Sequence, residues 1–356
     1  MHRRTAALVV SAALLLGMAG VAAALPVPYV TLSPGPVFNT LGEVADKPVI
    51  TVEGAATYPT DGVLDATTVY ETGGPGSRMT LFDAVRGWLD PAVSVVPREL
   101  LHPSDETAED AKQEGAQQMA FSQQDAVAAA LKYLDKPVRE VVQVVAVING
   151  SPADGVLRPA DLILSVDGKP AKGPDEVRAL ISSKTPGDPV TLRIQRGGRR
   201  MTKVIDTEAS PDDPNRAVIG VIPGAGYVSP ISVDIQLGNV AGPSAGLMFT
   251  LGIIDTMTPG QLGGGQHIAG TGTIAANGKV GPIGGIQQKL FGARDNGADY
   301  FLAPASNCDE VTGHVPRGLQ VVKVSTLDAA VQDVKAIAAG KADGLPTCTA
   351  TASASS

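Results

Sequence analysis

The sequence predicts a chain that mixes helices and strands in two or three domains behind an N-terminal membrane-spanning helix. Its 356 residues suffice for that number of domains. Its apolar content of 44% and charged content of 18% are typical of a folded protein. An uncharged run from Thr5 to Leu25 would span about 31 Å as a helix, enough to cross a bilayer core.

Composition also excludes several function classes. The net charge is -8 and no block of Lys or Arg stands out, which argues against a nucleic-acid partner. Four histidines and two cysteines argue against a zinc site of usual spacing. The sequence contains no G-x-x-x-x-G-K-S/T motif, and hence no P-loop ATPase. We therefore expect no metal and no cofactor.

The N-terminal segment, residues 5–25, is predicted to be a retained anchor in the cell membrane. Arg3 and Arg4 precede it and should stay in the cytoplasm, which places the rest of the chain outside the cell. A cleaved signal peptide is the alternative, because residues 22–24 are all Ala. The run is longer than a usual signal-peptide core, which favours the anchor.

Residues 26–124 carry no recognisable chemistry and are predicted to be a spacer. Strands are expected at Tyr29–Leu32, Val49–Val52 and Thr67–Tyr70, and a helix capped by Thr80 runs to Trp88. The acidic stretch from 104 to 118 fits an exposed helix or a linker.

Residues 125–208 contain a regular series of strands, turns and one helix. A Val/Ile-rich strand at Val141–Ile148 precedes G-S-P-A at 150–153. Another strand follows Asp161 and ends in a hairpin turn at Asp167-Gly168. A helix at Glu176–Ser182 and a strand at Val190–Gln195 complete the series.

This order resembles the PDZ domain of bacterial proteases, although Ala160 stands where that family usually has Gly. The resemblance implies peptide binding by strand addition at a sheet edge, with a backbone loop holding a terminal carboxylate. That loop is expected near Arg139 and Glu140, where no Gly-rich segment occurs. A small domain that only braces the fold is the alternative.

A reactive serine is predicted in the motif G-P-S-A-G at 242–246. Apolar residues at helical spacing follow it, so Ser244 lies near a helix N-terminus, where N–H groups and the helix dipole favour a developing anion. Such a serine could attack a carbonyl group. The alternative is an ordinary N-cap serine.

The same motif also matches the nucleophile elbow of α/β hydrolases. That reading needs a downstream acid (Asp255, Asp295, Asp299 or Asp309) and His314 as the base. The elbow usually follows several parallel βα units, whereas an anchor and a peptide-binding module precede it here. This order argues against the hydrolase.

A lysine is the preferred base. The G-P-I-G-G segment at 281–285 opens a helix whose apolar stripe (Ile286, Leu290 and Ala293) lies beside Lys289. Desolvation beside this stripe would lower the lysine pKa, and a neutral amine can take a serine proton. The alternative is a solvated surface lysine.

Together the two motifs resemble the Lon proteolytic domain over residues 215–340. The resemblance implies an α+β fold with Ser244 as nucleophile, Lys289 as base and Thr271 hydrogen-bonded to the lysine. Gly242 and Ala245 are the supporting positions. Many ATP-driven Lon proteins have Asp where this chain has Ala241. The family often forms hexameric rings, so a homo-oligomer is expected.

The whole arrangement resembles the membrane-anchored Lon-like PDZ proteases of bacteria. It implies an ATP-independent serine endopeptidase that cleaves extracytoplasmic proteins or peptides. A non-catalytic scaffold is the alternative. Cys308 and Cys348 are expected to form a disulfide in an oxidising compartment, with two unpaired thiols as the alternative. Residues 341–356 are predicted to be a tail.

Overall fold

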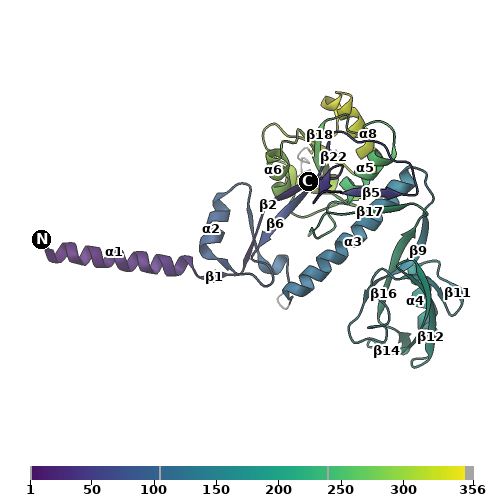
Figure 1. Ribbon diagram of the computed structural model, residues 1–356. Coiled ribbons are helices and arrows are strands. Elements are labelled where there is room, and N and C mark those ends of the chain that lie inside the picture. The colour runs from purple at the N-terminus through teal and green to yellow at the C-terminus, as the bar shows by residue number, and fades with distance from the viewer. Residues whose placement is uncertain (1, 104–105, 239, 349–356) are drawn as a thin grey trace, which may run out of the picture. The chain divides into compact units, whose positions relative to one another are not determined.

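The computed structural model describes residues 2–103, 106–238 and 240–348, and the chain folds into two compact units (Figure 1). The first unit combines the chain up to Tyr133 with the chain from Val233 onward, and the second comprises Leu134–Ser232. Residues 26–133, for the most part predicted to be a spacer, are therefore an integral part of the first unit.

Helix α1 (His2–Ala23) forms where the apolar run predicts a helix. Its described Leu, Val and Met side chains from Leu8 to Val21 are all more than half exposed. Among the residues that the structure describes, no helix meets the combined length and apolarity needed to cross a membrane. The predicted transmembrane anchor is thus not supported by the structure.

A six-stranded mixed sheet organises the first unit, in the order β22-β21-β18-β6-β2-β8. Strand β6 pairs in parallel with β18 on one side and antiparallel with β2 on the other. The sheet strands are β2 (Tyr29–Asn39), β6 (Val63–Thr72), β8 (Ser94–Pro97), β18 (His267–Gly270), β21 (Tyr300–Pro304) and β22 (Gln320–Val324).

Two segments of the predicted spacer and linker thus have structural roles. Strands β2 and β6 lie at the centre of the sheet because their apolar residues, such as Val30 and Leu64, are buried. The acidic stretch opens helix α3 (Ala108–Tyr133), whose second half is buried and packs on α5 (Gly246–Met257). The second half of α3 is therefore part of the core of the first unit.

Further helices cover the sheet. Helix α6 (Ile286–Asp295) packs on β2 and β6, and α8 (Leu327–Ala338) on β22. The smaller elements of this unit are β1 (Pro26–Val27), β3 (Glu43–Val44), β4 (Lys47–Pro48), β5 (Ile50–Glu53), β7 (Met79–Thr80), α2 (Leu81–Leu89), η1 (Arg98–Leu100), β17 (Ser232–Ile235), β19 (Thr273–Ile274), β20 (Val280–Gly281), η2 (Ala305–Asn307), α7 (Cys308–Val311) and η3 (Ala342–Gly344).

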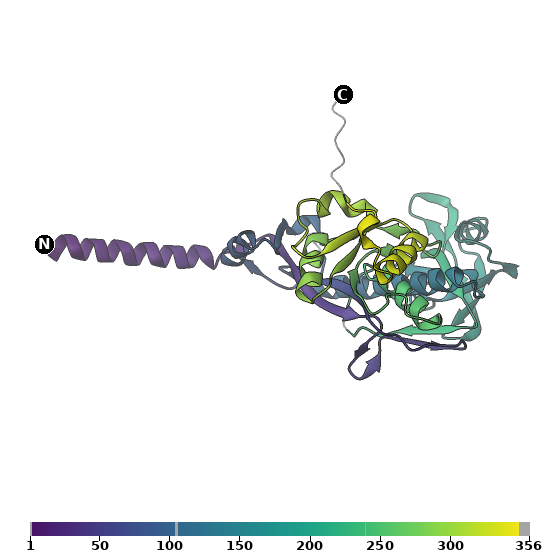
Figure 2. The same cartoon turned by 90° about the horizontal axis from the view of Figure 1, so that it is seen from above.

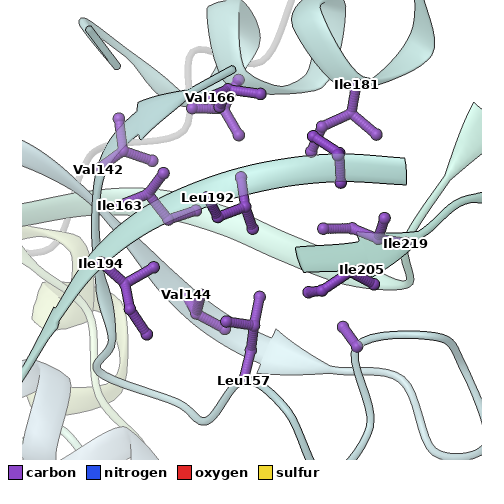
Figure 3. Close-up of a cluster of buried hydrophobic side chains, with 13 residues drawn as sticks. Val142, Val144, Leu157, Ile163, Val166, Ile181, Leu192, Ile194, Ile205 and Ile219 are labelled. Carbon is purple, nitrogen blue, oxygen red and sulfur yellow. The ribbon is translucent and has the colours of Figure 1, made fainter. Parts of the chain in front are cut away.

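The second unit is an antiparallel sheet in the order β13-β12-β10-β9-β16, with helix α4 (Pro174–Ser182) packed on it. Its strands are β9 (Arg139–Val147), β10 (Leu162–Val166), β11 (Lys169–Pro170), β12 (Pro189–Arg196), β13 (Arg199–Asp206), β14 (Glu208–Ser210), β15 (Asp213–Val218) and β16 (Val221–Val228). Alternating Val, Leu and Ile side chains from these elements form one buried core (Figure 3).

The boundary between the units differs from the predicted one. The catalytic domain was expected to begin at residue 215, but β15 and β16 belong to the second unit. The reason is pairing: β16 lies antiparallel along the whole of β9, from Val221 opposite Val147 to Val228 opposite Arg139. The strand that follows the predicted linker therefore completes the sheet of the preceding domain.

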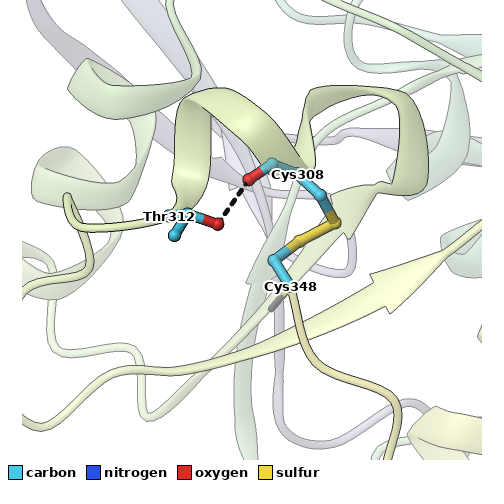
Figure 4. Close-up of a disulfide and its surroundings, with 3 residues drawn as sticks. All are labelled: Cys308, Thr312 and Cys348. Carbon is cyan, nitrogen blue, oxygen red and sulfur yellow. Dashed lines mark hydrogen bonds between the residues drawn. A yellow bond between two sulfur atoms is a disulfide. The ribbon is translucent and has the colours of Figure 1, made fainter. Parts of the chain in front are cut away.

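A disulfide joins Cys308, at the start of α7, to Cys348 (Figure 4). Cys348 also packs against the buried cluster formed by α6, β21 and their neighbours. Of the predicted tail 341–356, residues 341–348 therefore lie on the first unit, and residues 349–356 lie outside the described residues.

Candidate active site

Ser244 lies in a tight turn directly before α5, as the motif predicts. Gly242 has φ +87°, a left-handed conformation that favours glycine over other residues. Ala245 is the N-cap of α5, so Ser244 precedes the positive end of a twelve-residue helix. The turn therefore presents the hydroxyl beside the N-terminus of α5.

Helix α3 holds this turn in place through two hydrogen bonds. The Gly242 N–H donates to the Gly115 carbonyl at 3.0 Å, and the buried Ser122 hydroxyl donates to the Pro243 carbonyl at 2.9 Å. A β-carbon on Gly115 would come within 2.9 Å of the Ala241 side chain. The close approach of helix and turn thus depends on a small residue at 115.

Lys289 reaches Ser244 from the second turn of α6. Gly285, the N-cap of α6, is left-handed with φ +67°, and it turns the chain from β20 into the helix. The Lys289 side chain is buried, at 2% exposure. Its Nζ lies 2.8 Å from Ser244 Oγ and 3.0 Å from Thr271 Oγ1, within hydrogen-bond distance of both.

Thr271, directly after β18, links the lysine to the serine backbone. Its hydroxyl donates to the Ser244 carbonyl at 3.0 Å, and the Gly272 N–H donates to the same oxygen at 2.8 Å. The threonine hydroxyl oxygen also accepts a hydrogen bond from the Lys289 amine. One residue therefore fixes both the serine turn and the position of the amine.

Burial lowers the pKa of Lys289 from 10.5 to about 7. Among the described residues, both hydrogen-bond partners of the amine are hydroxyl groups, and neither carries a charge that would stabilise the ammonium form. Near pH 7, Lys289 is therefore a neutral amine in a substantial fraction of the molecules, and this amine is able to accept the Ser244 proton.

Ser244 and Lys289 line a cavity of about 360 Å³. One wall is the end of β6, and another is the serine turn together with α3. The lining residues are Pro36, Thr68, Val69, Tyr70, Glu71, Met119, Val240, Ala241, Gly242, Ser244, Ala245 and Lys289. The cavity gives a substrate carbonyl access to the serine hydroxyl.

Two backbone N–H groups are available for an oxyanion beside the serine. Those of Ser244 and Ala245 have no hydrogen-bond partner among the described residues. The N–H of Gly242 is already bonded to the Gly115 carbonyl. Gly242 therefore supports the site through its conformation, while Ala245 offers a donor.

The hydrolase alternative finds no matching geometry. His314 is exposed beyond α7, and no histidine is among the residues that line the serine cavity. Asp255 lies at the far end of α5, where its carboxylate accepts from the Leu262 N–H. Within the described chain, the hydrogen-bond partner of the Ser244 hydroxyl is Lys289.

Sequence reasoning missed the contribution of α3. Gly115, Met119 and Ser122 lie at positions i, i+4 and i+7, on one face of the helix, and all three meet the serine turn or line its cavity. Two small residues on one helix face, here Gly115 and Ser122, are a signal of close helix packing. The acidic residues around them obscured that signal.

The second unit has its own groove, beside the edge strand β16. A cavity of about 430 Å³ lies between β16 and α4, lined among others by Ile148, Arg178, Ile181, Gly220 and Val221. The predicted carboxylate loop near residues 139–140 is wrong, because both residues pair with β16 inside the sheet. The turn that enters the edge strand is instead at Gly220, with φ +71°.

Comparison with known proteins finds two family matches along the chain. Residues 119–207 match the family model of the PDZ domain, and residues 230–337 match the Lon protease (S16) C-terminal proteolytic domain. The chain carries a PDZ domain and a Lon-type proteolytic domain. Both domains were expected from the sequence motifs.

Individual relatives cover only part of the chain. A Lon protease of Azospirillum brasilense is 37% identical over 90 residues, covering 24% of this chain and 11% of that protein. A Lon protease of Phenylobacterium zucineum is 30% identical over 134 residues, covering 37% of this chain and 17% of that protein. The PDZ domain of an SdrC-like protein from Listeria monocytogenes is 30% identical, with a TM-score of 0.21, and the match covers 23% of this chain and 84% of that one.

Proposed function

We propose that this protein is a serine peptidase in which Ser244 is the nucleophile and Lys289 the general base. The observation that carries the proposal is the buried amine, 2.8 Å from the serine hydroxyl and with its pKa lowered to about 7. An ion-paired or solvated lysine would keep its proton and could not act as a base. The Lon-type proteolytic domain supports the same conclusion.

The proposed reaction is acyl transfer. The neutral Lys289 amine takes the Ser244 proton as Oγ attacks a peptide carbonyl, and the N–H groups of Ser244 and Ala245 stabilise the resulting oxyanion. The ammonium then gives its proton to the leaving amine. In the second half, the amine activates a water molecule that hydrolyses the acyl-enzyme.

Strand β6 supports an extended peptide as the substrate. Its pairing with β18 ends at Ala66, whereas its pairing with β2 continues to Thr72. On the β18 side, residues 68–71 have no strand partner in the described part of the chain, and they line the serine cavity. We propose that the substrate chain adds to this edge and so brings its carbonyl to Ser244.

The PDZ domain is proposed to bind substrate as well, by strand addition to the free edge of β16. ATP independence is also part of the proposal, since these 356 residues contain no P-loop motif. The disulfide supports an oxidising, extracytoplasmic compartment. Membrane anchoring and a hexameric ring stay predictions from the sequence.

Four variants test the proposal against its alternatives. Ser244→Ala and Lys289→Ala should each lower the cleavage of casein or a fluorogenic peptide by about 100-fold to 10,000-fold, the usual contribution of a positioned base. Lys279→Ala removes an exposed lysine and serves as the matched control. His314→Ala should leave cleavage unchanged.

The same experiment distinguishes the other candidates. Cleavage that survives Lys289→Ala in a folded protein would rule out the lysine as base. Loss of cleavage only in His314→Ala would select the Ser-His-Asp hydrolase. A wild-type protein that binds peptide but never cleaves it would select the scaffold.

A further inference from the structure

Helix α2 is firmly fixed to the first unit by its inner face and its N-terminus. Thr80 and Asp83 form a capping box, in which each side chain bonds the other's backbone N–H. Ala84 and Gly87 are buried, and a β-carbon on Gly87 would come within 2.8 Å of the Val95 side chain. The helix therefore has one defined orientation, with 84 and 87 inward.

The outward face of α2 carries large apolar side chains, with the exposed Arg86 at its margin, contrary to the usual pattern of a surface helix. At 100° per residue, Phe82 and Leu89 lie opposite the buried pair, with Val85 beside them. Their exposures are 59%, 81% and 43%. Trp88, at the edge of this face, is 56% exposed and packs edge-on against Tyr29, with ring centroids 5.8 Å apart. Large apolar side chains thus point into solvent together on one short helix.

This face continues into other exposed apolar residues at the end of α1. The Leu81 N–H donates to the Leu25 carbonyl at 2.9 Å, and β1 pairs with β7 immediately before α2. Leu25 is 52% exposed, and Leu100 is 70% exposed in η1, after the strand β8 that packs on α2. Figures 1 and 2 both show α2 on the side of the unit where α1 leaves it.

We propose that the outward face of α2, formed by Phe82, Val85 and Leu89 with Trp88 at its edge, docks on the surface of a lipid bilayer. The occupant follows from continuity with α1, whose described apolar side chains from Leu8 to Val21 are 58–74% exposed. Since Leu25 and α2 follow α1 closely, a bilayer that contacts the exposed apolar side chains of α1 would also reach them. A short helix with Trp, Phe and Leu on one face is typical of an interfacial segment.

The proposal is independent of the proposed peptidase activity and does not require α1 to cross the membrane. It predicts that the domain is held close to the bilayer by two neighbouring elements. The first is α1, and the second is the α2 face. Their adjacency would keep the first unit near lipid.

Trp88 is the single tryptophan of the chain and reports directly on this contact. The full-length protein is titrated with vesicles of phosphatidylcholine and phosphatidylglycerol, with and without brominated acyl chains. We expect a blue shift of the emission on binding and quenching by the brominated lipid. Phe82→Ser with Leu89→Ser should weaken the affinity that the Trp88 signal reports about 100-fold.

The matched control is Val204→Ser with Val315→Ser, which removes two exposed apolar side chains elsewhere. It should leave the Trp88 signal unchanged, and both double variants should cleave a soluble peptide normally. Vesicle binding without a change in Trp88 emission would overturn the proposal, as would the absence of vesicle binding. A shift that appears without lipid and grows with protein concentration would instead assign this face to a second copy of the chain.

Discussion

Replacing Lys289 by Met should abolish cleavage and stabilise the first unit at neutral pH. In the unfolded protein, Lys289 keeps its proton up to about pH 10.5. In the folded protein, it loses the proton near pH 7. Between these values the unfolded state binds more protons, so this residue makes stability rise with pH. At about 1.36 kcal/mol per pH unit, the buried amine lowers the free energy of unfolding by about 4 kcal/mol at pH 7 and about 2 kcal/mol at pH 9.

The substitution also removes the two hydrogen bonds of the amine, each worth about 1 kcal/mol. Lys289→Met should therefore be about 2 kcal/mol more stable than wild type at pH 7 and about equally stable at pH 9. Urea unfolding followed by Trp88 fluorescence measures this, because Trp88 lies in the same unit. Lys279→Met, at an exposed lysine, is the control. A difference independent of pH, or a variant less stable at pH 7, would refute the reasoning.

Other parts of the structure give three further predictions. Ser122→Ala should lower kcat about 10-fold with little change in KM, because the serine turn loses its hydrogen bond to α3. Cys348→Ser should reduce the free energy of unfolding by about 4 kcal/mol, given the sequence separation of 40 between the cysteines, and reduction of the wild type should have the same effect. Gly220→Ala places a β-carbon within 2.0 Å of Ser151 and should weaken peptide binding in an anisotropy assay, whereas Gly198→Ala, with a similar φ but nothing within 4 Å, should not. Equal binding by both glycine variants would argue against the β16 groove.

The site was predictable where its chemistry lies in short local motifs. Ser244 and Lys289 each sit in a Gly/Pro-rich turn that opens a helix, and local rules place such residues at helix N-termini. The short distance between their side chains could not be predicted from these local rules. It depends on α5 and α6 packing beside the same sheet, which the family resemblance supplied and local spacing could not.

The surroundings of the site could not be predicted, because they depend on contacts distant in sequence. Strand β6 forms a wall of the cavity although it lies about 175 residues before Ser244. Helix α3 looked like a polar linker because its first turns are acidic, whereas its role rests on Gly115 and Ser122. Pairing partners of strands, such as β16 with β9, are likewise not encoded in either strand alone.

The most direct test of the Ser-Lys mechanism is the pH dependence of Ser244 acylation by an active-site serine reagent, followed by mass spectrometry. The labelling rate of the wild type should rise through about pH 7 and reach a plateau above it, as the Lys289 amine loses its proton. In Lys289→Ala the plateau should disappear. A wild-type rate that keeps rising beyond pH 9, or labelling of Ser244 at full rate without Lys289, would contradict the lysine as its base.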